Sequence, residues 1–565
     1  MKSSEIDVDG IIRALGESTF FHTTQCILIC ASQLLATTNS FFYIFFAITP
    51  EYKCNNLTDS QFNQYNISIN EVSLTYDKCS IHINNDEGNT TENQTLNCLN
   101  GYYYTTPADM SIVSEWDLVC NKGGLAESTQ TVFILGQVIS GLMSPYLIER
   151  FGRKPIRVSS NFMLILFNLV AAFSPFYWTF AIMRFFTGVL RETYVISSIT
   201  LVCELYPKEK RIIMSGLFMF IWNIYSTSTG FIAYMLKDYG WNTYFLLNAV
   251  LSGYFIIDFF FLEESVRWLF ANSKMKAAEK IIRKAAKQNK VDFDEIWCRF
   301  VKDTVLPETD GQVNETSLQS RSSEPSPPVT AVVDHTQPQS EEESSVFVKL
   351  LTIFKSPYLR KVTIVVSIEC AVNTASQNMI IFMMEVFDGN IYINMSIFYF
   401  LAIITVGLAA ALAKRFGHKF SLTCFKTGVA VCIISASLIK IWAEDSESME
   451  YVFLALYLVS AAGLNAATAN DYIYTSELYP TQIRSAGNGF ATTFMRSVCM
   501  IAPYFKLLAL AIPWAPGIII GIASLCSTVM LRVCLPETGN RVLPQTIEEV
   551  NKMEQENKKN SVKIQ

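Results

Sequence analysis

The stretch CELYPKEKR at residues 203–211 returns at residues 476–484 as SELYPTQIR. A second pair lies upstream of these copies, ERFGRK at residues 149–154 and KRFGHK at residues 414–419. The two copies lie 273 residues apart in the first pair and 265 residues apart in the second. These similar distances indicate that the second half of the sequence repeats the first. The repeat therefore sets the fold that we expect.

Composition places this repeat in a membrane. Half of the 565 residues are hydrophobic, only 17% are charged, and the mean hydropathy is +0.27. Soluble proteins have about a quarter charged residues, so we predict an all-α membrane protein. With about 20 apolar residues per crossing, the predicted spans are 20–48, 127–148, 155–176, 178–202, 212–236, 242–262, 359–384, 391–413, 420–442, 450–474, 486–509 and 512–533. Each repeated stretch holds the same place in a set of six spans, which predicts two parallel six-helix repeats that can rock against each other.

Several function classes are excluded at this point. The formal net charge of −6 leaves no basic face for nucleic acid. The spans carry no cluster of metal-ligating or nucleophilic residues at their ends, so we predict neither an enzyme nor a metal or cofactor site. All four histidines, His22, His82, His335 and His418, lie outside the span centres, so a histidine proton relay is not expected.

Basic loops predict the orientation. The loops after spans two, four and eight are rich in Lys and Arg, the first of them with Arg157 beside residues 149–154, whereas residues 444–450 after span nine are acidic. By the positive-inside rule, the basic loops face the cytosol. Both termini, residues 1–19 and 535–565, are then cytosolic in a multi-pass plasma-membrane protein.

The long segment 50–124 is predicted to lie outside the cell. It holds four cysteines, as a disulfide framework in an oxidising compartment requires, and four N-glycosylation sequons. The cysteines are Cys54, Cys79, Cys98 and Cys120, and the sequon asparagines are Asn56, Asn66, Asn89 and Asn93. Three disulfide pairings are possible, and the sequence does not choose between them.

A cytosolic linker, residues 263–358, separates the bundles at 20–262 and 359–534. Residues 273–290 predict an amphipathic helix with Ala277, Ala278, Ile281, Ile282 and Ala285 near one face. That helix either lies on the inner membrane face or is a solvated helix that caps the cytosolic end. Residues 306–345 are too polar to form a core, and we expect them to be a disordered linker.

Further motifs identify a family. They are Ser114-Glu115-Trp116-Asp117-Leu118-Val119-Cys120, Glu149 to Lys154, Glu264-Ser265-Val266-Arg267-Trp268-Leu269, Glu477 to Pro480 with Arg484, and Leu535-Pro536-Glu537-Thr538-Gly539. With these motifs the chain resembles the organic cation, organic anion and carnitine transporter family of the major facilitator superfamily. Glu149, Val266 and Asn540 depart from the usual residues at their positions. The resemblance implies a carrier that works by alternating access, with the lipid bilayer and a small organic ion as partners and a coupling ion that is not identified.

The motifs also give candidate gating residues. Acidic and basic side chains at span ends can pair between neighbouring helices and cap helix termini. Such contacts hold the cytosolic side shut in one state and break in another. The candidates are Glu149, Arg150, Gly152, Arg153, Lys154, Glu204, Arg211, Glu264, Arg267, Glu477, Arg484 and Glu537.

Arg496 is the first candidate for solute binding. It lies twelve residues beyond Arg484, about 18 Å along a helix that starts at the inner face and hence near the membrane midplane. The resemblance implies an Arg here in anion and carnitine carriers and an Asp in cation carriers. A guanidinium holds a carboxylate in bidentate fashion, so we predict an organic anion or a carnitine-like zwitterion as solute. The alternative is a structural Arg held by backbone carbonyls or by Asp471.

Other polar residues within spans predict a pocket around Arg496. Glu369, Asn373 and Gln377 share one face of span seven, and Asp471 and Tyr472 lie with Asn470 in span ten. The two carboxylates could meet the cationic group of a zwitterion. The alternative for each of these residues is an interhelical polar contact.

Span four carries unusual charges. Arg184 and Gly188 resemble a superfamily pattern, and Arg191 and Glu192 follow them. These charges pair with each other or with Asp258 of span six, or Glu192 titrates as a coupling site. Two rival functions stay open, an organic cation carrier that uses Glu369 and Asp471, and a receptor on the same fold that does not transport.

Overall fold

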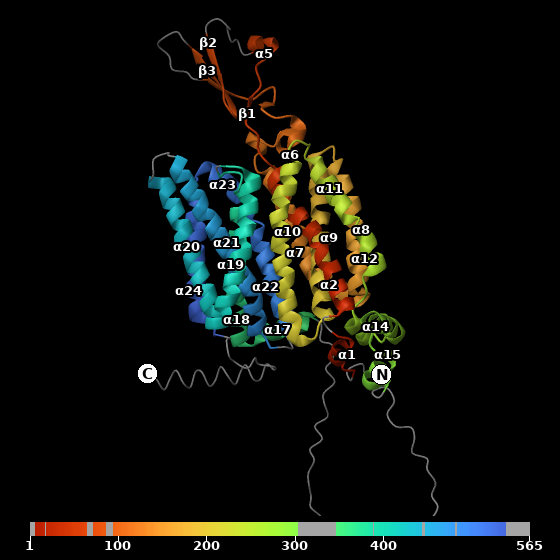
Figure 1. The fold of residues 1–565 in the computed structure, drawn as a ribbon. Helices are drawn as coiled ribbons and strands as arrows, with labels where there is room; N and C mark the ends of the chain where they lie inside the picture. Colours follow the sequence, from red (N-terminus) through yellow and green to blue (C-terminus); the bar gives the residue numbers. More distant parts are fainter. Residues whose placement is uncertain are drawn as a thin grey trace, which may run out of the picture.

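A computed structural model describes residues 6–16, 19–64, 72–85, 94–302, 346–387, 389–442, 447–480 and 483–537. Its long helices form two groups, one from each half of the chain, that stand side by side (Figure 1). Ten helical stretches in this described part are long and apolar enough to cross a membrane. With the long helices α9 and α10 beside them, they form the predicted twelve-span fold.

The N-terminal bundle comprises the spans of the first half. Its helices are α2 (Phe20–Ala31), α3 (Gln33–Phe41), α4 (Tyr43–Phe46), α7 (Leu125–Phe151), α8 (Arg153–Ala172), α9 (Tyr177–Leu205), α10 (Arg211–Met235), α11 (Asn242–Ser252) and α12 (Phe255–Phe261). The first span is broken into three helices because it is rich in polar residues. Ser32, Thr37 and Asn39 donate to backbone carbonyls three or four residues before them, a contact that bends helices.

The C-terminal bundle comprises the spans of the second half. Its helices are α18 (Pro357–Phe382), α19 (Ile391–Phe416), α20 (His418–Trp442), α21 (Glu447–Leu478), α22 (Arg484–Cys499), α23 (Phe505–Ala511) and α24 (Ala515–Cys534). The predicted span 486–509 is interrupted at Pro503, which has no backbone N–H to continue a helix. The bundles meet where α10 packs on α19 and α7 on α22. These two contacts are equivalent under the internal repeat.

Close helix packing explains Gly188. At the crossing of α9 and α7, a Cβ on Gly188 would lie 2.1 Å from the carbonyl oxygen of Phe133, and one on Gly136 would lie 2.3 Å from that of Phe185. Small residues allow such close approach of two helix backbones. Gly188 is therefore a packing residue.

The segment between α4 and α7 forms small sheets. Strand β1 (Tyr52–Cys54) pairs with β5 (Tyr102–Tyr104), and β2 (Val72–Tyr76), β3 (Ser80–Asn85) and β4 (Gln94–Asn97) form an antiparallel sheet in that order. Disulfides join Cys54 to Cys98 and Cys79 to Cys120, which selects one of the three open pairings. Asn56 is exposed, whereas Asn66, Asn89 and Asn93 lie outside the described residues. We call this end of the bundles the loop end (Figure 1).

The opposite end, here called the linker end, carries α14 (Met275–Asn289) and α17 (Val346–Lys355) (Figure 1). The buried face of α14 holds Ala278, Ile281, Ile282 and Ala285. It packs on α1 (Val8–Leu15), α13 (Val266–Ala271) and α15 (Phe293–Trp297). Protein covers this face, which agrees with the second alternative above, a helix that caps the bundle. The predicted disordered segment 306–345 lies outside the described residues.

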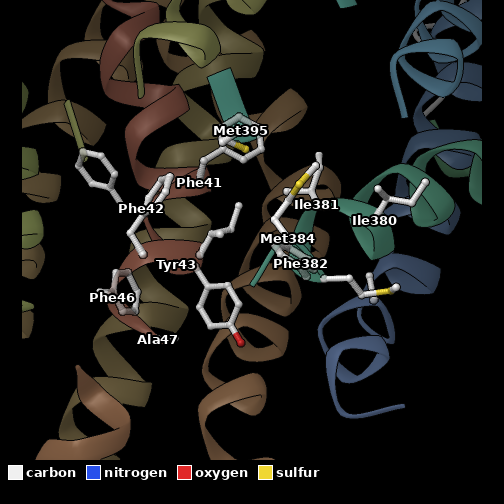
Figure 2. Packing of buried hydrophobic residues seen from close by; sticks show 14 of the residues in the cluster. Phe41, Phe42, Tyr43, Phe46, Ala47, Ile380, Ile381, Phe382, Met384 and Met395 are labelled. Carbon is white, nitrogen blue, oxygen red and sulfur yellow. The ribbon is translucent and has the colours of Figure 1, made fainter. Parts of the chain in front are cut away.

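At the loop end the two bundles share one apolar core. Phe41, Phe42, Tyr43 and Phe46 of the first span gather opposite Ile380, Ile381, Phe382, Met384 and Met395 of the second half (Figure 2). The rings of Tyr43 and Phe382 meet edge to face with centroids 5.5 Å apart, and those of Phe45 and Tyr392 stack at 5.1 Å. This packing closes the loop end between the bundles.

Candidate solute-binding site

Arg496 meets an acid of the other bundle. Its Nη2 lies 3.2 Å from Oε1 of Glu192 on α9, and Nη1 of Arg191 lies 2.6 Å from Oε2 of the same carboxylate. Glu192 and Arg191 are buried, whereas 23% of the Arg496 side chain is exposed. We call these three residues the triad. Of the predicted alternatives for span four, pairing of Arg191 with Glu192 is confirmed.

The triad carries one positive charge in excess. Two guanidiniums share one carboxylate, and Nε of Arg496 is buried without a hydrogen-bond partner among the described residues. Arg191 is further held by the ring of Trp222, 5.0 Å from its Cζ, and by the carbonyl of Ala36. A buried charge of this kind is stabilised by an ion of opposite sign. Arg496, the most exposed of the three, is the member that an anion can reach.

A small cavity of about 50 Å³ lies within the C-terminal bundle and includes Met495 of α22, the neighbour of Arg496, in its lining. Its lining also includes Asp471 and Tyr472 of α21 and Thr374 of α18. Sites for small organic molecules measure about 300–1,000 Å³. In this conformation the cavity has room for water but not for an organic ion.

The other predicted pocket residues lie within the C-terminal bundle. Glu369 and Asn373 share a face of α18, as predicted, and Asn373 donates to the carboxylate of Asp471. Glu369 pairs with Lys426 of α20. Gln377 accepts from Thr468 at 3.4 Å. The predicted alternative of interhelical polar contacts describes the contacts of these residues, while a role in solute binding stays a prediction.

Sequence reasoning did not name Lys426. It lies in the interior of span nine, where a lone lysine is costly and marks a polar partner or a functional site. That signal was present in the sequence. The identity of its partner was not, because 57 residues separate Lys426 from Glu369.

Two predicted contacts differ in the structure. Asp258 pairs with Arg157 of α8, with Oδ2 and Nε 3.0 Å apart, and both side chains are fully buried. Arg157 therefore lies on α8 in the interior of the bundle, and its assignment to a basic loop was wrong. Arg184 donates to Gln130 and lies over the ring of Phe133, with 4.2 Å from Cζ to the centroid.

The first gating motif forms a carboxylate cap at the start of α8. Gly152 has φ +106°, and its turn places the backbone N–H groups of Arg153 and Lys154 3.1 and 3.2 Å from the carboxylate of Glu264. Burial raises the pKa of the Glu264 carboxyl, and the three backbone N–H bonds that it accepts oppose this rise. Carboxylates stabilise helix N-termini in this way.

Ion pairs extend this motif within the N-terminal bundle. Arg153 pairs with Glu204 at 2.7 Å, and Arg267 pairs with Asp9 of α1 at 2.5 Å. The indole of Trp268 donates to the carbonyl of Glu149. The two remaining candidates have lesser contacts, since Arg150 donates to the Tyr146 hydroxyl and Arg211 interacts with Asp9 through charge alone.

The second gating motif repeats the cap at the start of α20. Gly417 has φ +93°, and the backbone N–H of Lys419 lies 3.4 Å from the carboxylate of Glu537. Arg484 donates to the carbonyl of Tyr479, and Glu477 lies 3.6 Å from His418. Gly152 with Glu264 and Gly417 with Glu537 are thus equivalent pairs. All of these contacts lie within one bundle, where they fix helix ends.

A buried ion pair joins the bundles at the loop end. Nζ of Lys506, on α23, lies 2.6 Å from Glu385 of its own bundle and 3.7 Å from Glu127 of α7. It also donates to the carbonyl of Ala47 at 3.2 Å. Sequence reasoning missed this site because all three ionisable residues lie near predicted span ends, where charges are common.

Comparisons with known proteins agree with this architecture. The model of the Major Facilitator Superfamily matches residues 122–503. Organic anion transporter 3 of Mus musculus is 28% identical over 97% of this chain and 94% of its own length, and an organic cation transporter protein of Drosophila melanogaster is 24% identical over 96% and 94%. Among solved structures, a D-xylose-proton symporter covers 93% of this chain and 100% of its own, with a TM-score of 0.58 and 13% identity.

Proposed function

Because this chain belongs to the Major Facilitator Superfamily and to its organic anion and cation transporter family, we propose that it carries small organic anions, or zwitterions that bear a carboxylate, by alternating access. The observation that carries this choice is the excess positive charge of the triad at the junction of the bundles. The relatives are named as organic anion and organic cation transporters, which supports an organic ion as solute.

In the proposed mode of binding, the solute carboxylate approaches the partly exposed Arg496 at the junction of the bundles. The Nε of Arg496, which has no partner among the described residues, and its Nη2 would form the bidentate fork that carboxylates prefer. Glu192 occupies Nη2 in this conformation. The solute therefore competes with Glu192, and this competition exchanges one contact between the bundles for another.

The proposed orientation puts the loop end outside the cell and both termini in the cytosol, at the plasma membrane. The two disulfides of the loop require an oxidising compartment, which supports this side for segment 50–124. In that orientation the shared core at the loop end closes the extracellular entrance. The carrier is then closed to the outside in this conformation.

The organic cation alternative depends on Glu369 and Asp471. The carboxylate of Glu369 already pairs with Lys426, and that of Asp471 accepts from Asn373. To pair with Glu369, a cationic solute would have to displace the buried Lys426 ammonium, which is costly. This cost, together with the partly exposed guanidinium of Arg496 at the junction of the bundles, supports our choice of an anion.

The test is uptake into oocytes that express the chain. Radiolabelled p-aminohippurate, carnitine and tetraethylammonium are offered to the wild type and to Arg496→Asp, Arg496→Lys and the control Arg299→Gln, which changes an exposed residue. We expect saturable uptake of p-aminohippurate or carnitine, its loss in Arg496→Asp, and a raised KM in Arg496→Lys, which keeps the charge but not the fork. Uptake of tetraethylammonium alone contradicts the proposal. Binding without flux of any probe in proteoliposomes favours a receptor.

A further inference from the structure

Three ionisable side chains lie buried together inside the C-terminal bundle. Glu369, Lys426 and Asp471 are 2%, 0% and 3% exposed. With all three charged, two carboxylates face one ammonium, and the group has a net charge of −1. A buried charge without a counter-ion is costly, so such a group takes up a cation.

The hydrogen bonds of the group also show that a donor is missing. Lys426 donates to Oε1 of Glu369 and to the hydroxyl of Ser527, and Nδ2 of Asn373 donates to Oδ2 of Asp471. Oε2 of Glu369 and Oδ1 of Asn373 are buried and have no partner among the described residues. The group therefore has more acceptors than donors, and both orphan oxygens belong to residues that are at most 2% exposed.

One proton removes the net charge and supplies one of the missing hydrogen-bond donors. On Asp471 it makes a hydroxyl that can donate to Asn373, whose amide then turns to present its oxygen, and on Glu369 it makes Oε2 a donor. In either place the group becomes neutral. A sodium ion fits less well, because the ammonium of Lys426 already lies against the Glu369 carboxylate. We propose that Glu369, Asp471 and Lys426, with Asn373, form a binding site for one exchangeable proton that crosses the membrane together with the solute.

The surroundings of the site contain few competing titratable groups. Cys370 of α18 and Tyr474 of α21 interact with Asp471 through charge. Arg496 of α22 acts on Tyr472, the residue after Asp471. His418 of α20 contacts Asn470 towards the linker end. The neighbouring helix α24 contributes the hydroxyl of Ser527.

The site borders the small cavity of the C-terminal bundle. Asp471 lines that cavity together with Met495, the neighbour of Arg496. Thr374 of α18 donates to the Met495 sulfur at 2.9 Å. A change in the spacing of α18, α21 and α22 on solute binding therefore reaches Asp471 directly. The charges of a monovalent anion and of a proton cancel, so their transport together moves no net charge across the membrane.

Infrared difference spectroscopy tests proton binding without knowledge of the solute. The full chain in liposomes is titrated from acidic to alkaline pH while the C=O stretch of protonated carboxylic acids is followed. We expect one buried carboxylic acid that persists to neutral pH and shifts in D2O. Asp471→Asn should lose it, because Glu369 and Lys426 then form a neutral pair. Lys426→Met should retain protonated carboxyls to more alkaline pH, because two carboxylates remain. Glu279→Gln, at an exposed residue, is the control.

Transport tests the second half of the proposal, which rests on the proposed function. Uptake of p-aminohippurate and carnitine into proteoliposomes is measured under an inward proton gradient and as counterflow at equal pH. In the wild type, we expect the rate of uptake under the proton gradient to exceed the rate of counterflow at equal pH several-fold. In Asp471→Asn, we expect no such excess. Replacement of sodium by N-methylglucamine should leave the ratio of these two rates unchanged.

The outcomes separate the two proposals. The proton site is overturned if the wild type shows no carboxylic acid that titrates. It is also overturned if the carboxylic acid signal persists in both Asp471→Asn and Glu369→Gln. Counterflow that proceeds with no response to the proton gradient overturns co-transport and leaves the carrier intact. Flux of no probe in either mode overturns the proposed function and co-transport with it, and the spectrum alone then decides whether the site binds a proton.

Discussion

Glu192 of α9 and Arg496 of α22 form an ion pair across the junction of the two bundles, with Oε1 and Nη2 3.2 Å apart. The pair places an acid of one half against the base of the other where the proposed solute binds. The second oxygen of Glu192 holds Arg191. Glu192 thus occupies, in this conformation, the position that a solute carboxylate would take.

Replacement of Glu192 by Gln should strengthen anion binding and lower the stability of the protein that holds no solute. The buried Arg191 and the partly exposed Arg496 then lose the carboxylate that they share, and loss of one partner of a buried pair costs about 3–5 kcal/mol. The melting temperature of the purified variant should fall, and p-aminohippurate should raise it more than in the wild type. Glu279→Gln serves as control, since its pair with Arg283 is exposed. Weaker anion binding in Glu192→Gln would show that Glu192 helps to hold the solute.

Much of this site could be predicted, except for its partners. The distance from Arg484 along one helix predicts the depth of Arg496 in the membrane, and the repeat predicts that two bundles surround it. Glu192, however, is 304 residues away, and helical periodicity says nothing about which face of α9 meets α22. The sequence offered Asp471 as a partner, but the structure joins Asp471 to Asn373.

Asp9 should stabilise the linker end in a pH-dependent way. Burial raises the pKa of the Asp9 carboxyl, but the hydrogen bond and the charge of Arg267 outweigh it and hold the pKa below 3.8. The folded pKa is depressed, so the stabilisation is complete above the ordinary pKa and is lost as pH falls through the folded value. At neutral pH, Asp9→Asn should therefore cost about 1–3 kcal/mol.

Hydrogen exchange of residues 8–15 and thermal unfolding measure this cost. The matched control is Glu209→Gln, which breaks the exposed pair of Glu209 with Arg13 at the same end and should cost under about 1 kcal/mol. Equal effects of the two variants would contradict the prediction. So would an Asp9→Asn variant whose exchange rates match those of the wild type at neutral pH.

Lys506 should hold the loop end closed. Lys506→Met leaves Glu127 and Glu385 to repel each other in a buried site, which favours conformations in which water reaches both. A reporter cysteine at Thr131, whose hydroxyl bonds the carbonyl of Met500 across the bundles, should then react several-fold faster with a membrane-impermeant thiol reagent. Lys440→Met, which breaks a partly exposed pair with Glu450, is the control. An unchanged labelling rate would mean that apolar packing alone closes this end.

The repeat predicted more than the positions of the spans. The matched stretches at residues 149–154 and 414–419 fold into the same turn. Glu264 caps α8, which follows the first turn, and Glu537 caps α20, which follows the second. The sequence could not reveal this, because each acid lies more than 100 residues beyond its glycine. The repeat nevertheless predicted that whatever one half does here, the other does as well.

This equivalence makes the two glycines testable as a pair. Gly152 and Gly417 have φ of +106° and +93°, and a Cβ would lie 2.4 and 2.6 Å from the carboxylates of Glu264 and Glu537. Alanine at either position strains the backbone by about 1–2 kcal/mol and displaces the capping carboxylate. Each variant should therefore melt at lower temperature, and the double variant should lose the sum of the two, since the sites lie in separate bundles.

The matched control is Gly407→Ala in α19, because a Cβ there meets nothing within 4 Å and alanine favours a helix. We expect this variant to be as stable as the wild type or slightly more so. Asp in place of Glu at 264 and 537 provides a second check, because a shorter carboxylate leaves room for the added Cβ but caps less well. If Gly152→Ala and Gly417→Ala melt like the control, the carboxylate caps contribute nothing measurable to stability.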